Sequence, residues 1–255
     1  PFLLLYISFI LLSLSKKDFS ISIATTNTDK WNQFDEQVKI IEVSMDSKEL
    51  SFPDAVIDIN AFDQVIIMLP PSRFDNYAKV IYGICSKLEP SKQLIFTSST
   101  GVYKNTGGTV DECGLIKDSH PVFKAEEVIR NYFQGSHSIL RLAGLLGDDR
   151  HPVKYLLKKE SISDGLSPVN LIQREDVIQA IKLLLYAGSS SSTYNLCYPD
   201  HPTKKSYYGD FATRFYGKQM NFKAGIIGKV VDGSKFVKKY QYEYLYPIRD
   251  VLITK

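Results

Sequence analysis

Short apolar runs alternate along this chain with segments whose apolar residues recur at helical spacing. The run Gln64–Leu69, with the sequence QVIIML, is apolar almost throughout and stops at a pair of prolines. Such runs are typical of strands that are covered on both faces, as in parallel sheets. Residues 74–88, which follow, repeat apolar side chains at helical intervals. The alternation predicts an α/β fold with a doubly wound parallel sheet.

The same alternation extends over most of the chain. We expect strands at residues 21–25, 39–43, 64–69, 93–97, 138–142, 169–172 and 193–197, and helices at residues 28–36, 74–88, 121–133, 152–159, 176–186 and 203–216. After Gly147 the pattern loosens, so we expect a sheet domain over residues 1–150 and a smaller C-terminal lobe over residues 151–255, packed on it. A chain of 255 residues is long enough for this division.

The chain opens on an apolar stretch, residues 1–14 (PFLLLYISFILLSL). This stretch is shorter than the roughly 20 residues that a membrane span needs. A signal-peptide core is one interpretation, because Ser13-Leu14-Ser15 resembles a cleavage site, although no basic segment precedes it. We prefer a helix that is buried on all sides within the α/β fold, and therefore expect no membrane contact.

Charge and cysteine content exclude several classes of protein. The net charge is only +3, and the Lys-Lys pairs are too short to indicate nucleic-acid binding. The three cysteines are far apart and form no CxxC pair, which argues against a disulfide framework or a metal site and favours a reducing, cytoplasmic compartment. Residues 151–255 are basic, so they either face an anionic ligand or form a solvated lysine-rich surface.

Four predicted strands are followed by small or polar residues. They end in IATTN (23–27), IIMLPPS (66–72), IFTSSTGVY (95–103) and RLAGLLGDDR (141–150). In a doubly wound sheet the ligand lies beyond the carboxyl ends of the strands. We therefore expect these four segments to converge on one ligand-binding crevice.

Two of these segments carry a resemblance to a known family. LIFTSSTGVY and ILRLAGLLGDDR, taken together, resemble the extended and atypical short-chain dehydrogenases/reductases, which include the NAD-dependent epimerase/dehydratase group. The similarity continues through NLIQREDVIQAI (170–181) and covers about residues 18–215. It implies a Rossmann-like NAD(P)-binding domain over residues 1–150, with a substrate lobe after it.

The resemblance also implies catalytic and substrate-binding residues. Ser99 matches the hydroxyl that polarises the substrate in that family, and Lys124 matches a ribose contact. Tyr103 is a candidate catalytic phenol near the expected site. Thr100 and Arg150 are expected to contact the substrate. From the residues alone, the hydroxyls that follow the strand equally suit hydrogen bonds within a turn.

The cofactor-binding residues implied by the resemblance lie at the strand ends. They are Thr25, Thr26, Asn27, Leu69, Pro70, Pro71, Thr97, Ser98, Leu142, Ala143 and Gly144. No carboxylate precedes Asp29 after the second family strand, which favours NADP slightly over NAD, because an acidic residue there would bind the ribose 2′-hydroxyl. The alternative is that residues 25–27 only form a turn and a helix cap.

The chain departs from the family pattern in two places. At the expected YxxxK pair, His120 stands four residues before Lys124 in place of the tyrosine, and it either shuttles protons or is a surface side chain. The glycine-rich phosphate-binding motif would fall near Leu3, Leu5 and Ser8, where no glycine occurs. Either the first strand is missing or altered, or the phosphate cradle is lost.

The sequence thus supports two hypotheses. The first is an NAD(P)-binding oxidoreductase, or an epimerase/dehydratase-like protein, which acts at a hydroxyl or carbonyl carbon of a small or nucleotide-linked substrate. The alternative is a non-catalytic relative of the same fold that senses NAD(P) or binds a protein, which the two departures favour. The family also makes a homodimer an expectation.

Overall fold

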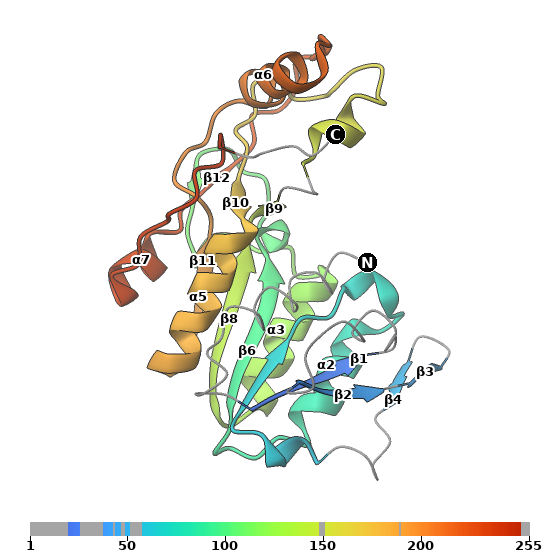
Figure 1. Cartoon of the computed structure of the whole chain (residues 1–255), viewed down its shortest axis with the longest axis vertical. Helices are drawn as coiled ribbons and strands as arrows, with labels where there is room; N and C mark the ends of the chain where they lie inside the picture. Colours follow the sequence, from blue (N-terminus) through green and yellow to red (C-terminus); the bar gives the residue numbers. More distant parts are fainter. Residues whose placement is uncertain are drawn as a thin grey trace. The chain divides into compact units, whose positions relative to one another are not determined.

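The computed structural model describes residues 20–25, 38–42, 44–46, 49–51, 58–147, 151–188 and 190–250. Several predictions lie outside these residues: the apolar run 1–14 with its glycine-motif positions, the helix at 28–36, Thr26, Asn27 and Arg150. Figure 1 shows the course of the chain and the labels of its helices and strands.

Strands and helices alternate through the described residues. The strands are β1 (Ile21–Thr25), β2 (Val38–Glu42), β3 (Ser44–Asp46), β4 (Glu49–Ser51), β5 (Gln64–Ile67), β6 (Gln93–Ser99), β7 (Thr109–Val110), β8 (Ser136–Leu142), β9 (Gly144–Leu146), β10 (Leu171–Gln173), β11 (Ser192–Leu196) and β12 (Val230–Val231). The helices are α2 (Tyr77–Cys85), α3 (Pro121–Tyr132), α4 (Val153–Leu156), α5 (Arg174–Ala187), α6 (Lys204–Tyr216) and α7 (Ser234–Tyr240), with short 3-10 turns η2 (Ile59–Ala61), η3 (Pro71–Arg73) and η4 (Thr100–Val102).

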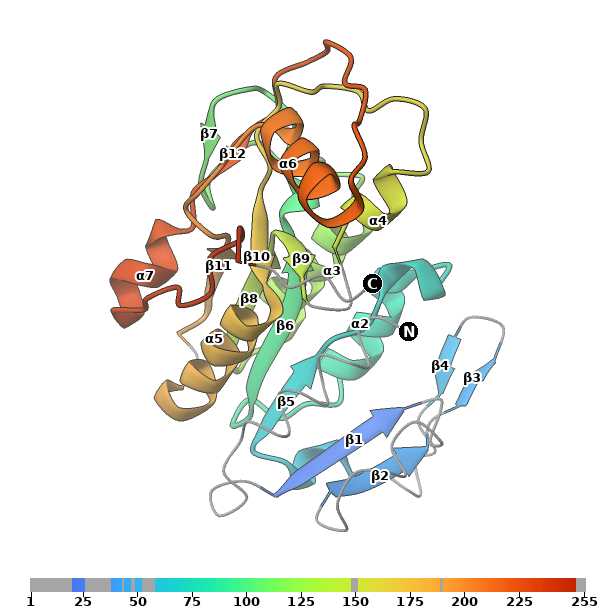
Figure 2. The ribbon, with the colours of Figure 1, turned by 45° about the horizontal axis from the view of Figure 1, so that its top comes forward.

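A four-stranded sheet forms the centre of the fold, with the strand order β11-β8-β6-β5. β5 and β6 are parallel, with Gln64 opposite Gln93, and helix α2 connects them. β1 and β2 form a separate parallel pair. Figure 2 shows α2 and α3 on one face of the sheet and α5 on the other. The predicted α/β fold with a doubly wound parallel sheet is confirmed.

Local signals explain where the main helices begin. Asn76 caps α2 by accepting a hydrogen bond from Lys79 N, and Thr203 caps α6 by accepting one from Ser206 N. α6 ends at Gly217, whose φ of 61° suits the left-handed conformation of a C-cap. α5 begins at Arg174, slightly before the predicted start at Asp176.

The chain divides into two compact units, which interleave along the sequence. Unit 1 contains Pro1–Thr97, Asp118–Ile139 and Ile181–Ser192, and unit 2 contains Ser98–Lys117, Leu140–Ala180 and Thr193–Lys255. Strands β6, β8 and β11 and helix α5 therefore each pass from one unit into the other. The predicted boundary at residue 150 stays a prediction.

Aromatic side chains fill part of the core of unit 1. The ring of Tyr77 on α2 stacks on Phe74, with centroids 6.0 Å apart, and lies 6.3 Å from the ring of Phe96 on β6. Outside this core, the exposed rings of Tyr82 and Tyr132 meet edge to face and join α2 to α3 at the surface. These contacts hold α2 and α3 beside the strands whose carboxyl ends are expected to bind ligand.

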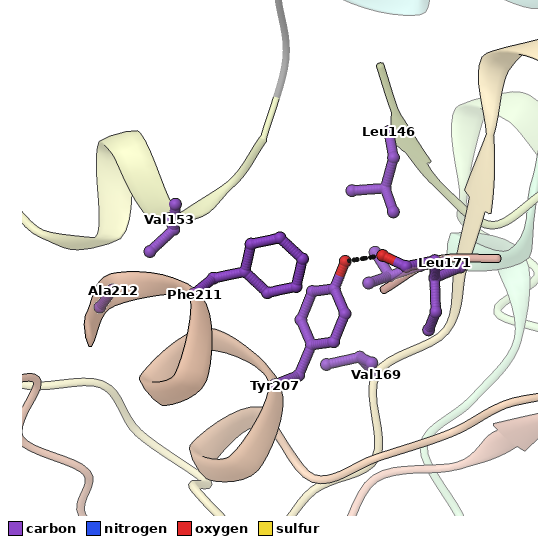
Figure 3. Close-up of a cluster of buried hydrophobic side chains, with 8 residues drawn as sticks. Leu146, Val153, Val169, Leu171, Tyr207, Phe211 and Ala212 are labelled. Atoms are coloured by element: carbon purple, nitrogen blue, oxygen red, sulfur yellow. Dashed lines mark hydrogen bonds between the residues drawn. The ribbon is translucent and has the colours of Figure 1, made fainter. Parts of the chain in front are cut away.

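Unit 2 has a core of its own, shown in Figure 3. The buried side chains come from β9, β10, α4, α6 and the connections between them: Leu146, Val153, Val169, Leu171, Tyr207, Phe211, Ala212 and Ile248. Tyr207 donates its hydroxyl proton to Ile248 O at 2.7 Å, so the residues that follow α7 are attached to this core. Within the described residues, every helix is too short or too polar to cross a membrane.

Candidate functional site

Ser99 lies where strand β6 ends and the 3-10 turn η4 begins. Its Oγ accepts a hydrogen bond from Gly101 N at 3.0 Å, which caps the turn. A serine hydroxyl has one proton to donate in addition to its acceptor lone pairs. Because the turn uses Ser99 Oγ as an acceptor, the hydroxyl proton remains available for an oxygen atom of a ligand.

Tyr103, immediately after this turn, is fully buried. Its hydroxyl donates to Asn195 Oδ1 at 2.7 Å and accepts from Arg141 Nη1 at 2.8 Å. The guanidinium of Arg141 also lies over the phenol ring, 4.9 Å from its centroid. Burial raises the pKa of Tyr103, which outweighs the opposing effect of Arg141. The phenol is therefore protonated and held in place by two buried partners.

A carboxylate completes this buried polar network. Glu112 Oε1 accepts a hydrogen bond from Asn195 N at 2.7 Å, and Glu112 O accepts one from Arg141 Nη1 at 3.2 Å. Asn195 Nδ2 donates to Asp232 O. Burial raises the pKa of Glu112. The network ties the Tyr103 segment to β8, β11 and the residues that precede α7, and so fixes the position of the Ser99 turn.

Two lysine side chains reach the carbonyls of this same segment. Lys117 Nζ donates to Gly101 O at 3.2 Å, and Lys229 Nζ donates to Tyr103 O at 3.3 Å. Burial and the nearby Lys117 ammonium lower the pKa of Lys229. The surroundings of the Ser99 turn in unit 2 are therefore positively charged.

In unit 1 the predicted cofactor residues lie at or beyond the carboxyl ends of β1, β5 and β6. Thr25 is the last residue of β1, and its partner in the strand register is Glu42. Thr97 Oγ1 donates to Ile67 O at 3.3 Å, so the ends of β5 and β6 lie side by side. Leu69 O accepts from the hydroxyl of Tyr77 at 3.0 Å. This hydrogen bond from Tyr77 fixes the backbone of Leu69, just before the Pro70-Pro71 turn.

Lys124 and His120 both belong to the start of α3. Lys124 is exposed, and its backbone N–H bonds to His120 O in the first turn. The imidazole of His120 caps the helix, because its Nδ1 accepts a hydrogen bond from Val122 N at 3.3 Å. The place of the family tyrosine is thus taken by a helix cap.

The segment Leu142–Gly144 connects β8 to β9 in unit 2. Leu142 and Ala143 are buried, and Ala143 N donates to Leu196 O. A Cβ at Gly144 would lie 2.8 Å from Leu171 Cδ2, closer than side chains pack. A larger residue there would force the Leu171 side chain on β10 to shift, and Asn170 O would lie only 3.1 Å from the added Cβ, so the neighbouring strand alone favours glycine at this position.

The structure brings together only part of the predicted site. In unit 2, Ser98, Ser99, Thr100 and Tyr103 share one strand end and turn. Thr25, Leu69, Pro70, Pro71, Thr97 and Lys124 belong to unit 1. The assigned roles of all these residues stay predictions. Sequence reasoning missed the contributions of Glu112, Asn195, Lys117 and Lys229, although an asparagine between Tyr194 and Leu196 in a predicted strand is a recognisable signal.

Among the described residues, no group of three or more His, Cys, Asp or Glu side chains is arranged to hold a metal ion. The side chains around the Ser99 turn carry hydroxyls, an amide, two ammonium groups, and the buried guanidinium and carboxylate of Arg141 and Glu112. Such groups bind substrates and nucleotides through hydrogen bonds and charge.

Solved structures of nucleotide-sugar enzymes share the whole fold. The chain is similar to dTDP-glucose 4,6-dehydratase from Bacillus anthracis in complex with NAD, with a TM-score of 0.75 and 16% identity over 97% of this chain and 89% of that one. It is also similar to UDP-glucuronic acid 4-epimerase from Bacillus cereus in complex with UDP-glucuronic acid and NAD, with a TM-score of 0.71 and 14% identity over 97% and 92% of the two chains. No family model matches the sequence.

These likenesses show the fold: it is that of the extended short-chain dehydrogenases/reductases of the NAD-dependent epimerase/dehydratase type. Among curated proteins, it is 33% identical to protein YeeZ of Escherichia coli K12 over 219 residues, which cover 81% of this chain and 77% of the relative. The chain therefore belongs to the family of protein YeeZ.

Proposed function

We propose that this protein binds a nicotinamide dinucleotide and acts on a hydroxyl or carbonyl carbon of a small or nucleotide-linked substrate, as an oxidoreductase or an epimerase/dehydratase-like enzyme. The observation that carries the proposal is the hydroxyl of Ser99. It lies at the carboxyl end of the central strand β6, is anchored by Gly101 N, and keeps its proton for a ligand. Side-chain donors at such a position stabilise an oxygen on which negative charge develops.

The described residues suit a dinucleotide in their chemistry. The ends of β1, β5 and β6 carry small, polar or proline residues, among them Thr25, Thr97 and Pro70, as is typical of the strand ends that bind dinucleotides. Lys124, which is exposed on α3, is the proposed ribose contact. When bound, the cofactor supplies or accepts a hydride at the substrate carbon.

The choice between the two cofactors rests on few residues. The comparison structures from both Bacillus species contain NAD. In this chain the absence of a carboxylate before Asp29 supports a proposed preference for NADP, because the ribose 2′-hydroxyl then lacks its usual acidic partner. Competition between the two reduced cofactors measures this preference directly.

Ser99 and the segment around it would act on the substrate. Ser99 donates its hydroxyl proton to the reacting oxygen, and Thr100, at the start of the turn η4, is a proposed substrate contact. Arg150 is proposed to bind an anionic part of the substrate, as the family resemblance implies. Tyr103 has both hydroxyl hydrogen-bond positions occupied, so we assign it to fixing the turn and not to proton transfer.

A second function is favoured by one specific observation. His120 replaces the tyrosine that this type of enzyme uses as its acid/base group, and its imidazole accepts a hydrogen bond from the helix backbone. A protein without a proton shuttle binds the cofactor but does not turn over. The alternative is therefore a non-catalytic relative that senses NAD(P) or binds a protein.

The test has two stages. NADH and NADPH are first titrated into the protein while cofactor fluorescence is followed, in the parent and in Lys124→Ala, with Lys87→Ala as an exposed lysine control in the same unit. Saturable binding that Lys124→Ala weakens supports the dinucleotide site. The absence of binding of either cofactor contradicts the proposal.

The second stage separates enzyme from sensor. The NAD- or NADP-loaded protein is mixed with UDP-glucose or UDP-glucuronic acid, and the formation of reduced cofactor and of altered sugar is measured by absorbance and by NMR. Conversion that Ser99→Ala abolishes supports the enzyme. Cofactor binding without conversion across a panel of nucleotide sugars and small carbonyl compounds supports the sensor.

We also propose a reducing, cytoplasmic location and a homodimer. The three cysteines, Cys85, Cys113 and Cys197, are all free thiols, which supports such a compartment. Sedimentation analysis of the purified protein tests the homodimer.

A further inference from the structure

We propose that Lys117 and Lys229 form a binding site for an anionic group, a phosphate or a carboxylate, of the molecule that reaches Ser99. This inference goes beyond the proposed function because it says which group of the ligand is bound and by which residues. It rests on the proposed function only for the identity of the rest of the ligand. All the residues that carry it belong to unit 2.

Both ammonium groups converge on one turn. Lys117 Nζ bonds to Gly101 O and Lys229 Nζ bonds to Tyr103 O, so they contact carbonyls of the same short segment. This segment begins at Ser99, whose Oγ bonds to Gly101 N. A group bound by the lysines thus lies next to the serine turn.

Within the described part of the chain, the positive charge of the two lysines has no carboxylate beside it, since none lies within ion-pair distance of either ammonium group. Burial, and in second place the repulsion by the Lys117 ammonium, lowers the pKa of Lys229. Two cations held close together without an anion are a cost to the fold that a bound anion removes.

Both lysines have hydrogen-bond donors to spare. Each ammonium group has three N–H bonds, and one of them is used by a backbone carbonyl. The remaining donors of both lysines are available for the oxygens of an anion. Charge-assisted hydrogen bonds of this kind are stronger than neutral ones.

The backbone of both lysines is fixed before any ligand binds. Lys117 N donates to Val102 O at 2.8 Å, beside the bridge between Tyr103 and Ile116. Lys229 N donates to Asn105 Oδ1 at 3.0 Å, and Lys229 O accepts from Asn170 Nδ2 at 2.9 Å. Binding therefore costs little backbone ordering, which favours affinity.

Exposed aliphatic side chains flank each lysine. Leu115, two residues before Lys117, is 65% exposed, and Ile227, two residues before Lys229, is 62% exposed. Large apolar side chains so open to solvent beside a charged pair suit a ligand that has an apolar or ring portion next to its anionic group. An organic phosphate or carboxylate has this composition.

The experiment measures anion binding to the whole protein without cofactor. Inorganic pyrophosphate and glucuronate are titrated separately by calorimetry, and pyrophosphate binding is also followed by phosphorus NMR. We expect Lys117→Gln and Lys229→Gln each to lower the association constant about tenfold, which corresponds to one charged hydrogen bond, and the double variant to abolish binding. Lys205→Gln, on α6, changes an exposed lysine outside this cluster and should bind as the parent does.

Glutamine keeps a donor for the carbonyl that each lysine contacts, and thermal unfolding verifies the fold of every variant. The charge-conserving variants Lys117→Arg and Lys229→Arg should bind within threefold of the parent. Binding of pyrophosphate alone, of glucuronate alone or of both supports the site and distinguishes a phosphate from a carboxylate. Failure of the parent to bind either probe, or equal binding by the parent and the double glutamine variant, overturns the inference.

The two proposals fail separately. Anion binding without NADH or NADPH binding leaves this site in place and removes the proposed function. Cofactor binding, together with unchanged anion affinity in the double variant, supports the proposed function and removes the lysine site.

Discussion

Arg141 Nη1 donates to the hydroxyl of Tyr103 at 2.8 Å, and both side chains are buried. This pair joins the strand β8 to the segment that follows the Ser99 turn. The same hydroxyl donates a hydrogen bond to Asn195 Oδ1 on β11, at 2.7 Å. The turn that carries the candidate catalytic hydroxyl is thus attached to two strands of the central sheet by one phenol.

Replacing Tyr103 by Phe should destabilise the fold. The change leaves a donor of Arg141 and the amide oxygen of Asn195 without the hydroxyl that each contacts. Leaving buried polar groups unpaired typically costs about 1–3 kcal/mol per group. We expect the free energy of unfolding in urea to fall by about 2–4 kcal/mol, given two such groups with partial relaxation.

The control for this variant is Tyr155→Phe, because Tyr155 is 56% exposed. It should change the free energy of unfolding by less than about 0.5 kcal/mol. If Tyr103→Phe matches the control in stability while conversion of a substrate is lost, the phenol is catalytic and the assignment to fixing the turn is wrong.

Ser99→Ala should separate activity from stability. Loss of the cap to Gly101 N costs about 0.5–2 kcal/mol of stability, whereas loss of a donor to a developing oxyanion reduces kcat about 100-fold or more. Ser99→Thr retains the hydroxyl and should recover most of the activity. Steady-state kinetics on a converted substrate, with urea unfolding in parallel, measures both effects. An alanine variant with parental kcat would remove Ser99 from the chemistry.

The order of the elements could be predicted from sequence because it depends on local periodicity. The run Gln93–Thr97 and the helical spacing of 121–133 correspond to β6 and α3 almost residue for residue. Helix α2 begins at Tyr77 and not at Phe74, because η3 occupies Pro71–Arg73 and Asn76 then caps the helix. A capping residue decides where a helix begins, even where apolar side chains recur at helical spacing before it. The ends of helices are therefore harder to predict from sequence than their existence.

The candidate site was predictable only where its residues are adjacent in sequence. Ser98, Ser99 and Thr100 follow a strand, and the strand end alone marks them. Tyr103 and Asn195 are separated by 92 positions, and their contact depends on the pairing of strands that no local pattern encodes. Lys117 and Lys229 resemble all other surface lysines in the sequence, since only the folded turn brings their ammonium groups to one segment.

Asp176 should be essential for holding the tyrosine-rich tail. Its buried carboxylate accepts hydrogen bonds from the Tyr242 hydroxyl and from the backbone N–H groups of Leu245 and Tyr246. Asp176→Asn keeps one acceptor oxygen but replaces the other with an NH₂ group. This group would face the hydroxyl and N–H donors that the carboxylate now accepts from. We expect a loss of about 2–4 kcal/mol in the free energy of unfolding and faster proteolysis after α7.

Asp200→Asn is the matched control, because the Asp200 carboxylate pairs with Arg249 at 2.9 Å where both side chains are largely open to solvent. An exposed pair contributes about 0–1 kcal/mol, so this variant should remain close to the parent. Equal protease resistance of the two variants would show that the tail is held by its aromatic contacts instead.

Stability should fall below pH 6.5 because of His151. This imidazole is buried in the core of unit 2, stacked on Phe211 with ring centroids 4.2 Å apart, and its Nε2 lies 3.2 Å from the Tyr207 hydroxyl. Burial lowers the pKa of His151 from 6.5 to about 4. Between these two values the unfolded chain binds a proton that the folded protein excludes, so stability decreases as the pH falls.

The stabilising effect is complete above pH 6.5, the pKa of the imidazole in the unfolded chain. It is lost by about pH 4, the pKa of His151 in the folded protein. It amounts to about 3 kcal/mol at most, at roughly 1.4 kcal/mol per pH unit. Urea unfolding between these limits measures the slope, and NMR of the imidazole nitrogens follows His151 itself. His151→Phe preserves an aromatic ring against Phe211 and should flatten this part of the pH profile. An unchanged slope in that variant would assign the acid sensitivity to other groups.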